Sequence, residues 1–144
     1  IQGPTQALRS LTGLLHYTEW VVGHVHMGTM GWVTMIISGS LYYMVTKLSG
    51  REVHSEKLAG LHFWLILVGQ LLFTVTLWIA GIAQGAMWKA ANADGSLTYT
   101  FLDSVASMYP YWKIRFAGGV LYFLGILVFA YNLVMTAHPK TAAA

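Results

Sequence analysis

The stretch HYTEWVVGHVHMGTMGWV, residues 16–33, carries two histidines, His24 and His26, within an otherwise apolar run. No Asp, Glu, Lys or Arg occurs from residue 20 to residue 46. This interval exceeds the roughly 20 residues that an α-helix needs to cross a bilayer. Because the backbone of a membrane-spanning segment must satisfy its own hydrogen bonds, the run predicts a transmembrane helix. The question is why a hydrophobic helix carries two imidazoles.

Two more charge-free runs, residues 58–88 and 116–139, follow along the chain. Only 9% of the 144 residues are charged, whereas a soluble domain has about 25%. We therefore predict an all-α membrane protein with three transmembrane helices over about 19–46, 58–88 and 114–137. The connection over about 89–113 contains SLTYTFLDSVASM, for which a short helix at the membrane surface is expected.

Three helices alone would make a thin bundle, and the first residue is Ile rather than Met. We therefore expect a single membrane segment of a larger or processed protein, packed against lipid and against other helices. The absence of cysteine excludes disulfides and thiolate metal sites. The sequence contains no Ser/His/Asp set, no phosphate-binding loop and no basic face for nucleic acid, so neither a hydrolase nor a nucleic-acid partner is expected.

The distribution of basic residues indicates an orientation. Lys47, Arg51 and Lys57 lie within eleven residues at the connection between the first two expected helices. Short cytoplasmic loops are enriched in Lys and Arg, so this connection is expected to face the cytoplasm. His24 and His26 are then expected near the opposite surface of the membrane.

The spacing of the two histidines limits what they can bind. Successive residues of an α-helix advance by about 100°, so His24 and His26 point about 200° apart and cannot share one metal ion. They can serve two sites on opposite flanks, and histidine is a standard axial ligand of haem iron. Gly23, Gly28 and Gly31 lower the helix surface where a flat macrocycle could approach. The alternative reading is a pair of hydrogen-bonded intramembrane histidines in a helix-packing protein without haem.

These residues carry a resemblance to a known family. HYTEWVVGHVHMGTMGWV resembles the tenth transmembrane helix of the catalytic subunit of haem–copper oxidases, and most of all the C family, the cbb3-type cytochrome c oxidases. GLHFWLILVGQLLFTVTLWIAGIAQGAMW, residues 60–88, resembles the eleventh helix, and MYPYWKIRFAGGVLYFLGILVFAYNLVMT, residues 108–136, the twelfth. The likeness covers nearly the whole chain, in order, and implies the C-terminal part of a twelve-helix bundle.

The resemblance implies roles for both histidines. His24 would be the proximal ligand of a high-spin haem b, where oxygen binds and is reduced, and His26 an axial ligand of a low-spin haem b. The second low-spin ligand, the histidines that hold a copper ion and the cross-linked tyrosine would lie outside this chain. The chain alone therefore lacks the copper ligands and would work only within a complex.

The resemblance also implies a setting. The complex would be a terminal respiratory oxidase, an oxidoreductase of the bacterial inner membrane with its haem ligands toward the periplasm. Its expected partners are the remainder of the catalytic subunit, membrane-anchored c-type cytochrome subunits and cytochrome c as electron donor. The family reaction reduces O2 to water and is coupled to proton translocation.

Two further residues are candidates for haem contacts. The family has a glutamate in a Glu-Gly-Pro sequence near the proximal histidine, whereas this chain has Gln2, followed by Gly3 and Pro4. A neutral amide makes the imidazole less basic than a carboxylate does, so a raised reduction potential of the high-spin haem is expected. Arg115 is expected to face haem propionates, because its planar fork suits carboxylates; its alternative is a helix-end anchor at the lipid headgroups.

Two other haem proteins remain alternatives. A nitric oxide reductase of the same superfamily has the same His-x-His pair, with a non-haem iron in place of copper. A non-catalytic dihaem membrane cytochrome would bind haem without a binuclear centre.

Overall fold

The computed structural model describes residues 2–138, so residue 139, where the last charge-free run ends, lies outside the described residues. Every secondary-structure element of the described part is a helix. This part contains no β-strand, only an isolated antiparallel bridge between Ala91 and Leu97. The predicted all-α class is confirmed. The elements are α1 (Gln2–Gln6), α2 (Arg9–Leu15), α3 (Glu19–His26), the π-helical η1 (Met27–Trp32), α4 (Val33–Ser49), α5 (Glu56–Lys89) and α6 (Phe101–Ala137).

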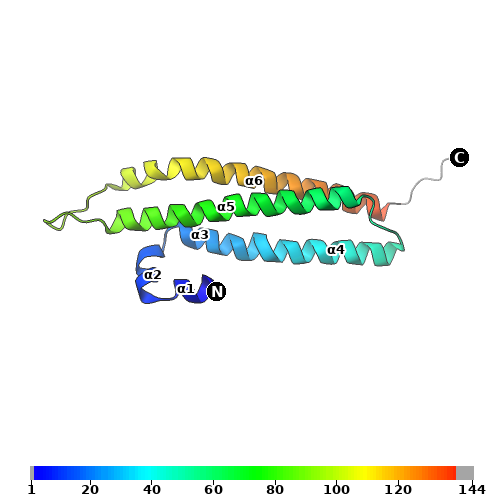
Figure 1. Ribbon diagram of the computed structural model, residues 1–144, viewed down its shortest axis with the longest axis horizontal. Coiled ribbons are helices and arrows are strands. Elements are labelled where there is room, and N and C mark those ends of the chain that lie inside the picture. Colours follow the sequence, from blue (N-terminus) through cyan, green and yellow to red (C-terminus); the bar gives the residue numbers. More distant parts are fainter. Residues whose placement is uncertain (1, 139–144) are drawn as a thin grey trace.

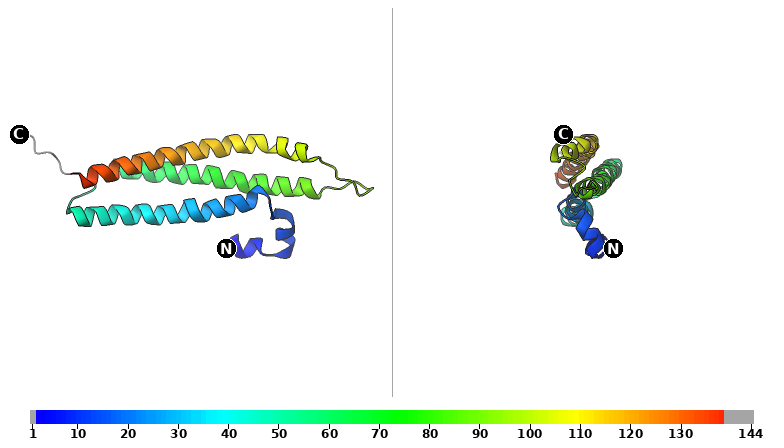
Figure 2. Two further views of the ribbon diagram at one scale, coloured as in Figure 1. Left: turned by 180° about the vertical axis from the view of Figure 1, so that it is seen from behind. Right: turned by 90° about the vertical axis from the view of Figure 1, so that its left-hand side faces the viewer.

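Three long rods lie side by side and make an elongated bundle (Figure 1). The first rod is α3, η1 and α4 in one continuous line, the second is α5, and the third is α6. Seen from behind, the short helices α1 and α2 fold back beside the start of α3 (Figure 2). Both α5 and α6 are long and apolar enough to cross a membrane, as judged by length and composition.

Helices α5 and α6 make backbone contact where Gly69 faces Gly118. A Cβ atom on Gly69 would lie 2.7 Å from the carbonyl oxygen of Gly118 and 2.7 Å from the backbone nitrogen of Tyr122. A Cβ atom on Gly118 would lie 2.8 Å from the carbonyl oxygen of Gly69. No side chain fits at either position, so the two glycines allow the close crossing of the two helices.

The N-terminal segment is held against α5. The Thr18 side chain caps α3 by accepting a hydrogen bond from the backbone nitrogen of Trp20 at 3.3 Å. Next to this cap, the backbone nitrogen of Glu19 donates to Oε1 of Gln84 at 2.9 Å. Gly81 faces the Trp20 backbone so closely that an added Cβ atom would collide with it. The start of α3, and with it the histidine pair, is therefore fixed relative to α5.

The third rod begins earlier than the sequence predicts. A helix was expected from about residue 114, after a separate surface helix, but α6 runs without interruption from Phe101. Thr100 and Asp103 form a reciprocal capping box that starts the helix there. The Trp88 indole then donates to the Ser104 hydroxyl at 2.9 Å and ties this first part of α6 to α5.

At the opposite end of the bundle, Asn132 joins α6 to the loop between α4 and α5. Its side chain is fully buried. Oδ1 accepts from the backbone nitrogen of Ser55 at 3.1 Å, and Nδ2 donates to the Ser55 carbonyl at 3.0 Å and to the Tyr42 hydroxyl at 3.2 Å. One amide thus fixes the residue that caps α5.

Candidate functional site

The ring of His24 is held by Gln2 from the short helix α1. The Nδ1 atom of His24 lies 3.0 Å from Oε1 of Gln2. Because an amide oxygen only accepts hydrogen bonds, Nδ1 carries the proton and donates it. The Nε2 atom then has the free lone pair of the ring. The fold-back of α1 beside α3 brings together these two residues, which stand 22 positions apart in the chain.

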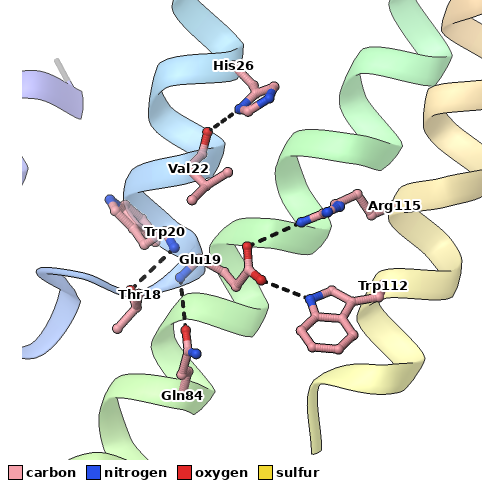
Figure 3. A network of polar contacts seen from close by, with 8 residues as sticks. All are labelled: Thr18, Glu19, Trp20, Val22, His26, Gln84, Trp112 and Arg115. Atoms are coloured by element: carbon pink, nitrogen blue, oxygen red, sulfur yellow. Dashed lines mark hydrogen bonds and ion pairs between the residues drawn. The ribbon is translucent and has the colours of Figure 1, made fainter. Parts of the chain in front are cut away.

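His26 is held within its own helix. Its Nδ1 atom lies 2.7 Å from the carbonyl oxygen of Val22, one turn earlier, so Nδ1 donates and Nε2 again has the lone pair (Figure 3). The ring also lies beside Phe73 of α5, with ring centroids 5.0 Å apart. His24 and His26 therefore contact different elements, α1 and α5, and each has its own Nε2 atom available.

The donor chemistry of the two rings fits haem. An imidazole that ligates a metal normally donates its other ring N–H to a carbonyl or carboxylate oxygen, which fixes its tautomer and orientation. Both rings have this arrangement, with an amide oxygen at His24 and a backbone carbonyl at His26. Within residues 2–138 no three His, Cys, Asp or Glu side chains gather as a metal site.

Arg115 lies beside the His26 site and is paired with Glu19. The Nη1 atom of Arg115 lies 3.4 Å from Oε2 of Glu19, and the Trp112 indole donates to Oε1 of the same carboxylate at 2.8 Å (Figure 3). The guanidinium carbon also lies 5.7 Å from the centroid of Phe73, the ring that contacts His26. The structure thus places Arg115 inside α6 near His26.

Sequence reasoning missed the role of Glu19 as the partner of Arg115. The two residues stand 96 positions apart, so no local pattern joins them. The sequence feature that could have indicated the pairing is that each residue directly precedes a charge-free run, Glu19 the first and Arg115 the last. The first rod and α6 run in the same direction, so Glu19 at the start of α3 and Arg115 in the first half of α6 lie toward the same end of the bundle and can meet (Figure 1).

The π-helical segment η1 begins directly after His26 and was also missed. The Nε2 atom of Gln70 donates to the carbonyl oxygen of His26 at 3.2 Å. The Tyr122 hydroxyl lies 2.9 Å from the carbonyl oxygen of Met30 and 2.7 Å from the hydroxyl of Thr34. Side chains from α5 and α6 therefore contact η1 at both ends, and π-helical turns are frequent at functional sites.

The family model for cytochrome c and quinol oxidase polypeptide I matches residues 1–121. Among curated proteins, the chain is 47% identical over 143 residues to the cbb3-type cytochrome c oxidase subunit CcoN1 of Stutzerimonas stutzeri, covering 99% of this chain and 30% of that protein. It is 44% identical to cytochrome c oxidase subunit 1 of Rhodobacter capsulatus, covering 98% of this chain and 27% of that protein. A nitric oxide reductase chain of Stutzerimonas stutzeri is 23% identical over 139 residues, covering 88% of this chain and 29% of that protein.

The chain spans less than a third of the length of these relatives. The resemblance to cbb3-type oxidases, inferred from the segments around the histidine pair and in the two following helices, is confirmed. The protein belongs to the cytochrome c and quinol oxidase polypeptide I family.

Proposed function

We propose that this chain forms the haem-binding wall of the catalytic subunit of a cbb3-type terminal oxidase, which takes electrons from cytochrome c and reduces O2 to water. In this proposal His24 is the proximal ligand of a high-spin haem b and His26 an axial ligand of a low-spin haem b. The observation that carries it is the pair of imidazoles with Nδ1 engaged and Nε2 available, two residues apart and in contact with different helices.

When bound, the two haems, together with a copper ion held outside this chain, supply the electron transfer and the oxygen reduction. The chain's own residues hold and orient the ligands. Gln2 fixes the tautomer of His24 through a neutral amide rather than a carboxylate. The Val22 carbonyl fixes the tautomer of His26.

Arg115 is proposed to bind a haem propionate. Guanidinium has five N–H donors, and Glu19 accepts from one of them, at Nη1. The side chain of Arg115 is 36% exposed, which supports a role toward a group at the surface of this segment. Its contact with the Phe73 ring directs the guanidinium to the His26 flank rather than the His24 flank.

The proposed setting is a bacterial inner membrane with the histidine end toward the periplasm. Arg51 and Lys57, in and just after the loop between α4 and α5, support a cytoplasmic position for that end. The proposed partners are the remainder of the catalytic subunit, c-type cytochrome subunits, cytochrome c and lipid. Coupling of the reaction to proton translocation is part of the same proposal.

The visible spectrum of the reduced complex, with and without carbon monoxide, tests the proposal. We expect two haem signals, only one of which carbon monoxide shifts. His24→Ala should remove the carbon monoxide-sensitive signal, and His26→Ala should remove the insensitive one. Two signals without any carbon monoxide response would replace the oxidase with an electron-transferring dihaem cytochrome. Unchanged haem content in both variants would overturn haem binding by these residues.

Nitric oxide reduction is the competing activity within the superfamily. The higher identity to oxidases, 47% and 44% against 23%, favours oxygen. Turnover of the purified complex with each gas separates the two activities. Consumption of nitric oxide without consumption of oxygen would assign the chain to a nitric oxide reductase.

A further inference from the structure

We propose that Gln70 and Tyr122 are positioning residues for His26, which they orient by holding the π-helical segment η1 that follows it. The inference rests on the proposed ligation of a low-spin haem by His26. Gln70 belongs to α5 and Tyr122 to α6, so the segment is held by both long helices of the bundle. Neither residue is expected to touch the haem.

Segment η1 departs from the α-helical hydrogen-bond pattern, and side chains from α5 and α6 bond to its backbone and to the residues beside it. A π-helical turn bonds residue i to i+5, and such turns occur mostly as short interruptions of α-helices. Gln70 binds the backbone just before η1, at the His26 carbonyl. Tyr122 joins the Met30 carbonyl within η1 to the Thr34 hydroxyl in α4. Side-chain partners thus hold both ends of the irregular turn.

The glycine crossing of α5 and α6 brings these two partners to the same level. Gln70 directly follows Gly69, and Tyr122 lies one turn after Gly118. The backbone nitrogen of Tyr122 would itself be 2.7 Å from a Cβ atom on Gly69. The close backbone contact of the two helices at Gly69 and Gly118 therefore fixes the Gln70 amide and the Tyr122 hydroxyl relative to each other and to η1.

The burial of Gln70 makes its contact specific. Its side chain is 3% exposed, and Nε2 donates both to the His26 carbonyl and to the Thr74 hydroxyl, the latter at 2.6 Å. Gly31 of η1 is also buried, with the Gln70 side chain 3.8 Å from where its Cβ would be. A change in the path of η1 would consequently move the His26 backbone against a buried amide, and the imidazole would turn with it.

The electron paramagnetic resonance spectrum of the oxidised complex tests the inference, because the g-values of a low-spin haem depend on the orientation of its axial imidazoles. Tyr122→Phe removes only the hydroxyl, and Gln70→Leu removes the donor to His26. We expect either variant to retain both haems while the low-spin signal shifts or splits into more than one species. The carbon monoxide-sensitive signal of the haem at His24 should stay as in the unaltered complex.

Tyr131→Phe is the matched control, because Tyr131 lies on the same helix and is exposed, but stands nine residues beyond Tyr122, where its ring lies beside His54 instead of η1. Unaltered low-spin g-values in both Tyr122→Phe and Gln70→Leu would overturn the inference. An equal loss of both haems, with unaltered low-spin g-values in the complexes that still contain haem, would also overturn the inference. That pattern is expected when the two residues only stabilise the fold.

Two further variants keep the outcomes distinct. Thr34→Val removes one acceptor of the Tyr122 hydroxyl and keeps the tyrosine, so it reports on the contact even where Tyr122→Phe or Gln70→Leu fails to assemble. We expect a smaller shift of the same signal, and no shift would overturn the inference. A low-spin signal that persists in His26→Ala would overturn the proposed ligation itself, independently of Gln70 and Tyr122.

Discussion

The Nδ1 atom of His24 lies 3.0 Å from Oε1 of Gln2, so the candidate proximal ligand donates its ring proton to a neutral amide. The partner comes from α1, a five-residue helix that would have little stability by itself and that folds back beside α3. The hydrogen bond at the Nδ1 atom of His24 therefore depends on the single side chain of Gln2, which can be exchanged by one substitution.

The first prediction concerns Gln2→Glu. A carboxylate acceptor strengthens the hydrogen bond by roughly 1 kcal/mol and makes the imidazole more basic, which stabilises the oxidised iron. We expect the reduction potential of the carbon monoxide-binding haem to fall by about 40 mV, the equivalent of about 1 kcal/mol for one electron. A spectroelectrochemical titration measures it. Ser10→Glu, which adds the same charge at an exposed position of α2, should leave the potential nearly unchanged; equal potentials in Gln2→Glu and the unaltered complex would contradict the prediction.

The second prediction concerns Glu19→Gln. The substitution removes the negative charge beside Arg115, while an amide can still accept from the Trp112 indole. Because a nearby carboxylate favours the oxidised form of a bound haem, we expect the low-spin haem at His26 to rise in potential more than the haem at His24. Redox titration of both signals checks this. Glu52→Gln, an exposed change in the loop at the other end of the bundle, is the control and should move neither.

The third prediction concerns Gly69→Ala. The new Cβ atom would lie 2.7 Å from backbone atoms of Gly118 and Tyr122, so α5 and α6 must separate. We expect a loss of roughly 1–3 kcal/mol in stability, seen as a lower temperature of haem release on heating. Gly60→Ala, on the same helix with nothing within 4 Å, should be neutral or slightly stabilising, since alanine favours a helix. Equal melting of the two variants would contradict a backbone crossing at Gly69.

Much of the bundle could be predicted from the sequence, because the bilayer excludes charge. The three charge-free runs correspond to the first rod, α5 and α6, and the bounds of α5, Glu56–Lys89, nearly coincide with the predicted 58–88. The start of α6 could not be found in this way. The charge-free run begins only at residue 116, which suggested a connection before it, whereas α6 starts at Phe101 and contains Pro110, Lys113 and Arg115 within the helix.

Only part of the candidate site could be predicted from the sequence. The opposite directions of His24 and His26 follow from helical periodicity, and their contacts with α1 and α5 agree with it. The π-helical turn had no such signature, because one turn is too short to show a changed period and its partners come from distant helices. The pairing of Glu19 with Arg115 likewise depends on how the rods are aligned, which composition does not encode.

The fourth prediction concerns Asn132, which joins α6 to the loop before α5. In Asn132→Leu the backbone nitrogen of Ser55 loses its acceptor, whereas the Ser55 carbonyl still accepts from the backbone nitrogen of Ala59. Leaving the Ser55 nitrogen without a partner costs about 1–3 kcal/mol. We expect the loop around Arg51 to open more often, so that its amide hydrogens exchange faster and trypsin cleaves at Arg51 sooner. The spectra of the haems at the opposite end should be unaffected. Asn132→Asp keeps the acceptor for the Ser55 nitrogen but buries a carboxylate oxygen against the Ser55 carbonyl, so it should open the loop at least as much as Asn132→Leu. Exchange and cleavage rates that are the same in Asn132→Leu and the unaltered complex would show that the loop is held by other contacts.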